Sequence, residues 1–175
     1  MRRALILDFD GLIMDTETPW FVAWRAIYAR CGQELTHDDW FEAIGHIANF
    51  DPKAELERRL GHTPDWGPLE EERARIDRAL RAKQRPLPGV ERLLRDGRER
   101  GYAIGVASNS DSAWVEKGLA QAGVREFIEV VVAWDGSFQP KPHPDPYALA
   151  LRQLDARPEG SWAFEDSHPG LASAK

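Results

Sequence analysis

Several features that would mark a special class of protein are scarce or absent in this sequence. Cysteine occurs once in 175 residues, at Cys31, so no disulfide can form within the chain and a zinc site built from several cysteines is excluded. No apolar run approaches the roughly 18 residues that a membrane-spanning helix needs, and the N-terminal residues lack the hydrophobic stretch of a secretory signal. We therefore expect a cytoplasmic protein with no membrane partner.

An excess of positive charge is also missing. Lysine and arginine total 23 against 29 aspartates and glutamates, which gives a formal net charge of −6 at pH 7. A mildly acidic chain has no overall field that would attract a polyanion, so nucleic acid is not expected as a partner. A small phosphorylated substrate would need local compensation of its charge by a metal ion or a lysine.

The remaining composition, 42% hydrophobic and 30% charged, is typical of a globular protein. Short apolar runs typical of buried strands occur at residues 4–7, 102–107, 127–133 and 162–164. Between the last three runs lie segments of about ten residues with helical spacing, and such alternation requires right-handed crossovers. The sequence therefore predicts an α/β fold, with a doubly wound, Rossmann-like parallel sheet covered by helices on both faces.

The first crossover is much longer than the others and contains no convincing strand. In residues 16–85 the apolar side chains recur at helical spacing, as in Trp20, Phe21, Trp24 and Ile27. This interval is predicted to be an all-helical insertion. The predicted domains are therefore an α/β core of residues 1–15 and 86–175, and a helical domain of residues 16–85.

Polar residues follow each predicted strand. Each group alone fits a turn or a helix cap, which are common at such positions. In a parallel sheet, however, the carboxyl ends of the strands form the edge where ligands bind. We expect the following groups to meet there: Asp8 with Asp10, Ser108 with Asn109, Lys141, and Glu165 with Asp166.

The residue types at this edge favour phosphoryl transfer. Four neighbouring carboxylates repel one another unless a cation compensates them, and hard oxygen ligands select Mg²⁺. A carboxylate can attack a phosphoryl group when Mg²⁺ and a lysine neutralise the incoming charge. A second carboxyl two residues further on can protonate the leaving oxygen and later deprotonate the attacking water. These residues thus suit a mechanism that passes through an aspartyl phosphate.

Four ordered motifs resemble those of the haloacid dehalogenase superfamily, in particular its phosphatase and β-phosphoglucomutase-like branch with a helical cap inserted after the first motif. The resemblance covers essentially the whole chain. It rests on DFDGLIMDTE from Asp8 to Glu17, SNS from Ser108, KPHPDPY from Lys141 and FEDSHPG from Phe164.

The resemblance implies a catalytic role for three residues. Asp8 would be the nucleophile and a ligand of Mg²⁺. Asp10 would be the general acid and base and would also offer its backbone carbonyl to the metal. Lys141 would neutralise the transferring phosphoryl group beside Asp8. The activity implied is a Mg²⁺-dependent phosphatase that hydrolyses a small phosphorylated metabolite through an aspartyl phosphate.

The same resemblance implies a set of binding residues. Ser108 and Asn109 would bind the transferring phosphoryl group, and Asp166 with Glu165 beside it would complete the metal site. Glu17 could contact the leaving group, as polar residues after the first motif do in similar proteins. A charge that favours the first turn of a helix is an equally good interpretation of Glu17.

Other activities of the superfamily fit less well. The dehalogenases lack the second acid of the first motif, which is present here as Asp10. The mutases of the β-phosphoglucomutase type carry a histidine and an arginine in the cap, and Trp20 and Asn49 stand near those positions here. Neither side chain can do the work of the residue it replaces. A phosphatase is favoured on these grounds, with a sugar-phosphate mutase as the alternative.

The sequence stops at Lys175, a few residues into a predicted helix after Gly170. Similar proteins continue with the rest of this helix and a further strand, so the chain is expected to be short relative to them. A second alternative is therefore a weakly active remnant that binds metal and phosphate. The strand at 162–164 would then be an open sheet edge, through which two copies could pair as a homodimer.

Overall fold

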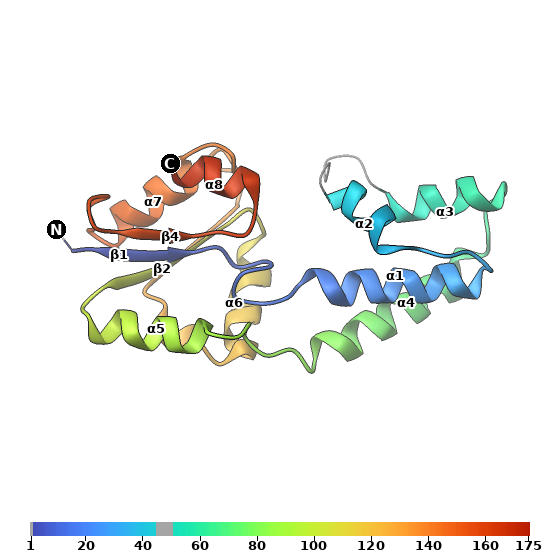
Figure 1. Cartoon of the computed structure of the whole chain (residues 1–175), viewed down its shortest axis with the longest axis horizontal. Coiled ribbons are helices and arrows are strands. Elements are labelled where there is room, and N and C mark those ends of the chain that lie inside the picture. The colour runs from blue at the N-terminus through green and yellow to red at the C-terminus, as the bar shows by residue number, and fades with distance from the viewer. Residues whose placement is uncertain (1, 45–50) are drawn as a thin grey trace. The chain divides into compact units, whose positions relative to one another are not determined.

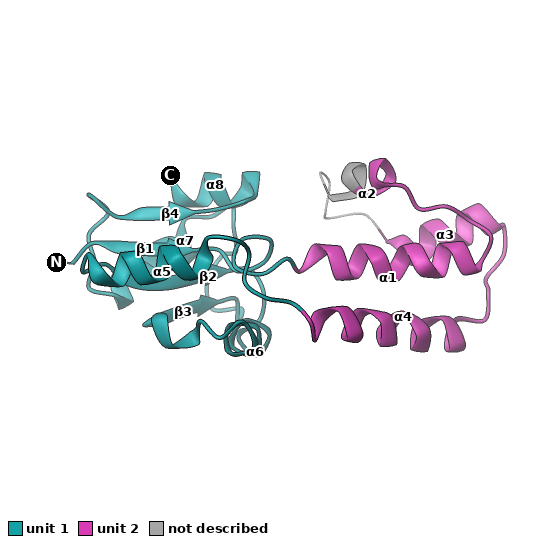
Figure 2. Ribbon diagram, turned by 60° about the horizontal axis from the view of Figure 1, so that its bottom comes forward, with its two compact units in different colours: residues 1–15, 84–175 teal, residues 16–83 magenta. Residues whose placement is uncertain are grey.

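The computed structural model describes residues 2–44 and 51–175, which fall into two units drawn in different colours in Figure 2. One unit joins Met1–Asp15 to Gln84–Lys175, and the other is Thr16–Lys83. Asn49, which bears on the choice between phosphatase and mutase, lies outside the described residues.

The first unit is built on a sheet of four parallel strands in the order β3-β2-β1-β4. These strands are β1 (Ala4–Leu7), β2 (Ala103–Ser108), β3 (Val130–Ala133) and β4 (Trp162–Phe164). Strand β1 lies at the centre, where Leu5 is in register with Ile104 on one side and with Trp162 on the other. All four of its residues are buried, as expected for a strand covered on both faces. The predicted parallel α/β fold is confirmed.

Successive residues of β1 pack into the hydrophobic cores on opposite faces of the sheet, because side chains alternate between the faces of a strand. Leu5 and Leu7 pack with α5 (Val90–Glu99) and α6 (Ser112–Ala122). Ala4 and Ile6 belong to the core on the other face, with α7 (Asp145–Gln153), and α8 (His168–Ala174) adds Ala174 there. Figure 1 shows the two helix pairs on opposite sides of the sheet. This layering leaves the strand ends free to carry a site.

The third strand is shorter than the sequence predicts. Instead of extending from residue 127, the chain forms a 3₁₀ turn at Arg125–Phe127 and enters β3 only at Val130. Backbone bonds from Phe127 to Val124 and from Ile128 to Arg125 close this turn. Phe127 and Ile128 still pack in the core beside α6. Apolar residues that pack at the end of a turn and those of a strand give the same apolar run, so hydrophobicity could not distinguish them.

The described residues of the second unit form helices joined by short loops, and no strand occurs among them. Its helices are α1 (Glu17–Arg30), α2 (His37–Ile44), α3 (Pro52–Leu60) and α4 (Trp66–Arg81). Asp51 and Asp65 cap the starts of α3 and α4 by accepting hydrogen bonds from backbone N–H groups. The helices enclose an apolar core rich in aromatic side chains: Phe21, Trp24, Ile27, Tyr28, Leu35, Trp40, Leu56 and Leu69.

Strand β4 forms one edge of the sheet and is its most exposed strand. Trp162 is 61% exposed there, and Leu171 of α8 is 48% exposed. Pairing of two copies through this edge stays a prediction.

Among the described residues, none of the helices combines the length and the apolar character needed to cross a membrane.

Candidate active site

The structure brings residues of all the predicted polar groups to the carboxyl ends of the strands. Asp8 directly follows β1, Ser108 is the last residue of β2, and Lys141 lies between β3 and α7. Glu165 and Asp166 directly follow β4. Because the strands are parallel, their carboxyl ends lie on the same side of the sheet, and these positions lie there together. The contacts described next show which side chains meet.

Asp8 is a buried carboxyl group, only 7% exposed. Its backbone N–H donates to the carbonyl of Phe164 at 3.0 Å, which ties the end of β1 to the end of β4. Burial raises the pKa of Asp8 to about 7, a change that the Lys141 ammonium opposes and the Glu165 charge reinforces. An ionised Asp8 in this place therefore depends on nearby positive charge.

Lys141 supplies that charge. Its Nζ donates to Asp8 Oδ1 at 2.5 Å and to Glu165 Oε1. The lysine is held by Asn109, because Lys141 N donates to Asn109 Oδ1 at 2.8 Å and Asn109 Nδ2 donates to the Lys141 carbonyl at 3.2 Å. The side-chain amide of Asn109 thus anchors the lysine loop, a role that the sequence did not suggest. Its contact with a phosphoryl group stays a prediction.

Three carboxylates form an acidic cluster. Asp8, Glu165 and Asp166 each offer one oxygen, and these oxygens lie within 4.8 Å of one another. Burial raises the pKa of Asp166, and the charge of Glu165 adds to the effect. Like charges held this close favour a cation, and oxygen donors of this kind suit a hard divalent ion. The cluster could hold a metal ion.

Glu165 is held by two side chains that lie within the motifs but had no predicted role. Its own side chain is fully buried, and it accepts hydrogen bonds from the Tyr147 hydroxyl at 2.6 Å and from Ser167 Oγ at 3.2 Å. Burial and the bond to Glu165 raise the pKa of Tyr147 above its usual value. Tyr147 therefore stays a neutral donor. Tyr147 is the last residue of the KPHPDPY motif, but no role was predicted for its side chain.

Two glycines leave room for these carboxylates. A Cβ atom at Gly170 would lie 2.0 Å from Glu165 Oε2, so even a methyl group would displace the glutamate. A Cβ atom at Gly11 would lie 2.1 Å from Asp166 Oδ2, and the positive φ of 78° also favours glycine there. The acidic cluster is thus packed against backbone on two sides.

Asp10, expected to join the other carboxylates, points its oxygens elsewhere. Ser110 Oγ donates to Asp10 Oδ2 at 2.6 Å, and Trp114 Nε1 donates to Asp10 Oδ1 at 2.9 Å. Its carboxylate is not among the three of the acidic cluster. Asp10 is still close enough for its charge to contribute to the raised pKa of Asp166, after burial and Glu165. The structure therefore separates Asp10 from the three carboxylates grouped as a metal cluster.

The other predicted residues fall into different surroundings. Ser108 is buried, and its Oγ accepts a hydrogen bond from the backbone of Ser110 at 3.0 Å. Glu17 is exposed at the start of α1, in the helical unit, and its contact with a substrate stays a prediction. Trp20, also on α1, packs edge-on against Trp40 with ring centroids 4.8 Å apart.

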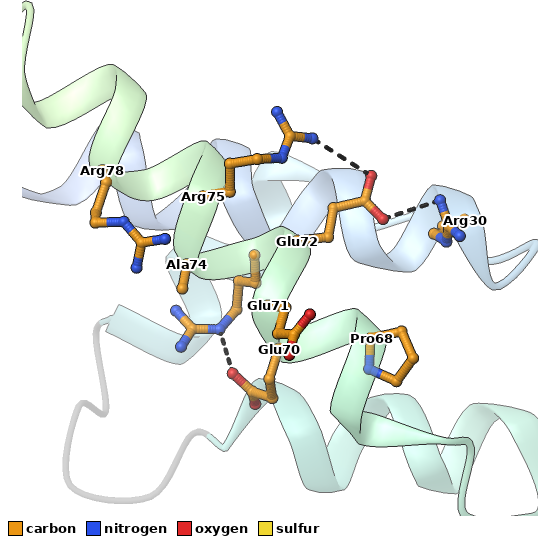
Figure 3. A pocket seen from close by; sticks show the side chains of 9 residues that line it. Arg30, Pro68, Glu70, Glu71, Glu72, Ala74, Arg75 and Arg78 are labelled. Carbon is orange, nitrogen blue, oxygen red and sulfur yellow. Dashed lines mark hydrogen bonds and ion pairs between the residues drawn. The ribbon is translucent and has the colours of Figure 1, made fainter.

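A hollow of about 900 Å³ lies on the helical unit, between Pro68 and Arg78 of α4 and beside Arg30 of α1 (Figure 3). It contains none of the predicted site residues. Several of its charged side chains pair with one another, since Glu72 binds Arg30 at 2.9 Å and Glu70 binds Arg73 at 2.8 Å. Such mutual pairing is typical of a solvated helix surface.

Comparisons with known proteins find a hydrolase family model and phosphatases that are similar to this chain. The family model described as haloacid dehalogenase-like hydrolase matches residues 5–175. The chain is 37% identical over 175 residues to "Putative phosphatase YhcW" of Bacillus subtilis, an alignment that covers 100% of this chain and 80% of that protein. It is 28% identical over 171 residues to fructose-1-phosphate phosphatase YqaB of Escherichia coli, covering 98% and 90%.

A solved structure shares the fold. It is a HAD family hydrolase from Deinococcus radiodurans, determined with bound phosphate and sodium. It superposes with a TM-score of 0.74 at 26% identity, over 99% of this chain and 78% of the other.

Proposed function

The chain belongs to the haloacid dehalogenase-like hydrolase family, and on that premise we propose that it is a Mg²⁺-dependent phosphatase that works through an aspartyl phosphate on Asp8. The substrate would be a small phosphorylated metabolite. Phosphorylated sugars are the first class to test, because a relative is a fructose-1-phosphate phosphatase.

The observation that carries the proposal is the bridge made by Lys141 between two buried carboxylates. Its ammonium contacts Asp8 at 2.5 Å and also binds Glu165. An anionic nucleophile can approach an anionic phosphate ester only if fixed positive charge reduces the repulsion. Lys141 is placed to supply such charge beside Asp8.

The residues suit a reaction in two steps. An oxygen of Asp8 attacks phosphorus, the bond from phosphorus to the ester oxygen breaks, and the departing oxygen takes a proton from Asp10. Water then attacks the phosphorus of the aspartyl phosphate and gives a proton to Asp10, and the bond between phosphorus and the Asp8 oxygen breaks. Inorganic phosphate leaves, and both aspartates return to their starting forms.

The metal would be held by Asp8, Glu165 and Asp166, with the backbone carbonyl of Asp10 as a further expected ligand. The three clustered carboxylates supply the hard oxygen donors that Mg²⁺ prefers, and their mutual repulsion favours a cation. When bound there, Mg²⁺ would offset the negative charge of the phosphoryl group. Ser108 and Asn109 are the proposed contacts to that group.

The helical unit is the proposed cap, which selects the substrate. Hydrolysis is favoured over a mutase reaction because Trp20 stands near the position where a mutase carries its cap histidine. The Trp20 indole can donate a hydrogen bond but cannot shuttle a proton as imidazole does. Glu17, at the start of α1, is the proposed contact to the leaving group.

Turnover is expected to require Mg²⁺. Purified protein should release inorganic phosphate from p-nitrophenyl phosphate and from members of a phosphorylated-sugar panel, lose this activity in EDTA, and regain it when Mg²⁺ is added. Phosphorus NMR would separate free phosphate from an isomeric sugar phosphate, which a mutase would form. If no phosphate ester is hydrolysed but Mg²⁺ or phosphate still binds, the chain binds these ligands without hydrolysing them and the phosphatase proposal is wrong.

Gly170→Ala is expected to lower kcat/KM by on the order of 10²-fold and to weaken Mg²⁺ binding. The added methyl group would overlap the Glu165 carboxylate, and a displacement of about 1 Å in a catalytic group can cost this much. Initial rates across a Mg²⁺ titration would measure both effects.

Gly67→Ala is a matched control for this change. Gly67 lies in the first turn of α4 as Gly170 does in α8, and the backbone N–H of each donates to the side chain that caps its helix. A Cβ atom at Gly67 would meet only Asp65 Oδ1, at an ordinary 3.4 Å. We expect no loss with the control, and equal activity of the two variants would contradict the role given to Glu165.

A further inference from the structure

Both oxygens of the Asp10 carboxylate are held by neutral hydrogen-bond donors from the segment around the start of α6. We propose that Trp114 and Ser110 act as positioning residues that hold the Asp10 carboxyl group in the orientation from which it serves the leaving group. The inference rests on the proposed function, in which Asp10 is the general acid. It gives a role to Ser110, the last residue of the SNS motif, and to Trp114, neither of which had one before.

The two donors are themselves rigidly placed. The backbone N–H of Trp114 donates to the helix cap Asp111 at 3.0 Å, and its indole packs on the core beside α6. Ser110 is fixed on both sides, because its N–H donates to Ser108 Oγ at 3.0 Å and its carbonyl accepts from the N–H of Trp134 at 3.0 Å. Neither donor has to be ordered when Asp10 acts, which is what effective positioning requires.

Helix α6 lies close to the turn after β1 that contains Asp10. Gly118 lies one turn after Trp114 on the same side of the helix, and a Cβ atom there would lie 2.1 Å from the ring of Phe9. Phe9 is the chain neighbour of Asp10 and is buried in the core. The missing side chain therefore lets α6 come near enough for the Trp114 indole to reach Asp10 Oδ1.

The two donors hold the carboxyl group through both of its oxygens. The Trp114 indole N–H donates to Oδ1, and the Ser110 hydroxyl donates to Oδ2. Two such contacts fix the orientation of the group. As the bond from phosphorus to the ester oxygen breaks, that oxygen takes the proton of Asp10, and both donors stabilise the carboxylate left behind.

The test uses the leaving group of the substrate. An alkoxide leaving from a sugar phosphate needs a proton, whereas p-nitrophenolate leaves well without one. For each substrate kcat/KM reports the steps up to formation of the aspartyl phosphate, and excludes the later hydrolysis that the substrates share. Trp114→Phe, which keeps an aromatic ring but removes the donor, is expected to lower kcat/KM for the best sugar phosphate by on the order of 10²-fold. The loss on p-nitrophenyl phosphate should be several-fold smaller.

Matched variants complete the experiment. Ser110→Ala should give the same selective loss, whereas Ser110→Thr, which keeps the hydroxyl, should restore most of the sugar-phosphate activity. Trp162→Phe, at a 61% exposed tryptophan of β4, should leave both rates unchanged. Equal losses on the two substrates, or no loss on either, would overturn the inference. A wild-type protein that hydrolyses no phosphate ester would instead refute the proposed function, and the inference would fall with it.

Discussion

Asp8→Asn is expected to lose turnover by on the order of 10⁴-fold or more, because an amide oxygen is too weak a nucleophile to attack phosphorus. The amide has nearly the same shape as the carboxyl group and can still accept the hydrogen bond from Lys141. Loss of activity would therefore report the missing nucleophile and not a disturbed fold. Initial rates on p-nitrophenyl phosphate and on the best sugar phosphate measure the effect.

The same substitution is expected to stabilise the metal-free protein above pH 7. Burial raises the pKa of Asp8 from 3.8 to about 7, so the folded protein holds this proton more tightly than the unfolded chain does. The stability contributed by the protonated group is present at low pH and is lost as the pH rises from about 4 to about 7. Since one pKa unit corresponds to about 1.4 kcal/mol, the ionised carboxylate costs a few kcal/mol at pH 8.

Urea unfolding in EDTA at pH 5 and pH 8 separates these expectations. The variant should match the wild type more closely at pH 5 and exceed it at pH 8. Asp96→Asn, at a half-exposed carboxyl group of α5, is the control and should alter neither activity nor stability appreciably. A rate for Asp8→Asn within tenfold of the wild type would exclude Asp8 as the nucleophile.

The sequence was sufficient to predict which strand ends carry the site, because polar residues after buried apolar runs stand out against their surroundings. Asp8, Lys141, Glu165 and Asp166 meet as expected once the parallel order of the strands is known. The separate position of the Asp10 carboxylate could not be predicted in the same way. It depends on the direction of one side chain and on how closely α6 approaches.

The side chains that hold the site residues in place could not be predicted either, because this too depends on the direction of individual side chains. Tyr147 and Trp114 lie among apolar residues at helical spacing, which is the pattern of an ordinary core face. Their polar atoms nevertheless reach Glu165 and Asp10. A single sequence gives the spacing of aromatic residues but not where their polar atoms point. Asn109 is similar, since an amide after a strand suits a ligand contact as well as the loop anchor that it forms.

Lys141→Gln is expected to impair both activity and stability. Activity should fall by on the order of 10³-fold, because the positive charge beside Asp8 is lost. Two buried carboxylates, Asp8 and Glu165, would lose their shared cation, and removing one partner of a buried ion pair costs about 3–5 kcal/mol. For a chain of this size the unfolding midpoint should fall by roughly 10 °C in metal-free buffer. Lys117→Gln, at an exposed lysine of α6, serves as the control.

The stability loss in Lys141→Gln should depend on pH in a definite direction. The Lys141 charge lowers the pKa of Asp8, so its removal moves that pKa above about 7. A raised carboxyl pKa stabilises the folded state only while the group is protonated. The variant should therefore lose less stability at pH 5 than at pH 8. A loss equal at both values would show that it does not come from the ionised Asp8 carboxylate.

A double variant can isolate the interaction between the two residues. If the harm in Lys141→Gln comes from an unpaired carboxylate, then adding Asp8→Asn removes that carboxylate and should restore much of the stability at pH 8. Activity should stay absent, since nucleophile and ammonium are both missing. The two changes would then be strongly non-additive in the free energy of unfolding, as expected for groups in direct contact. If Asp8→Asn instead adds the same stability to the Lys141→Gln variant as to the wild type, the contact between Lys141 and Asp8 does not stabilise the fold.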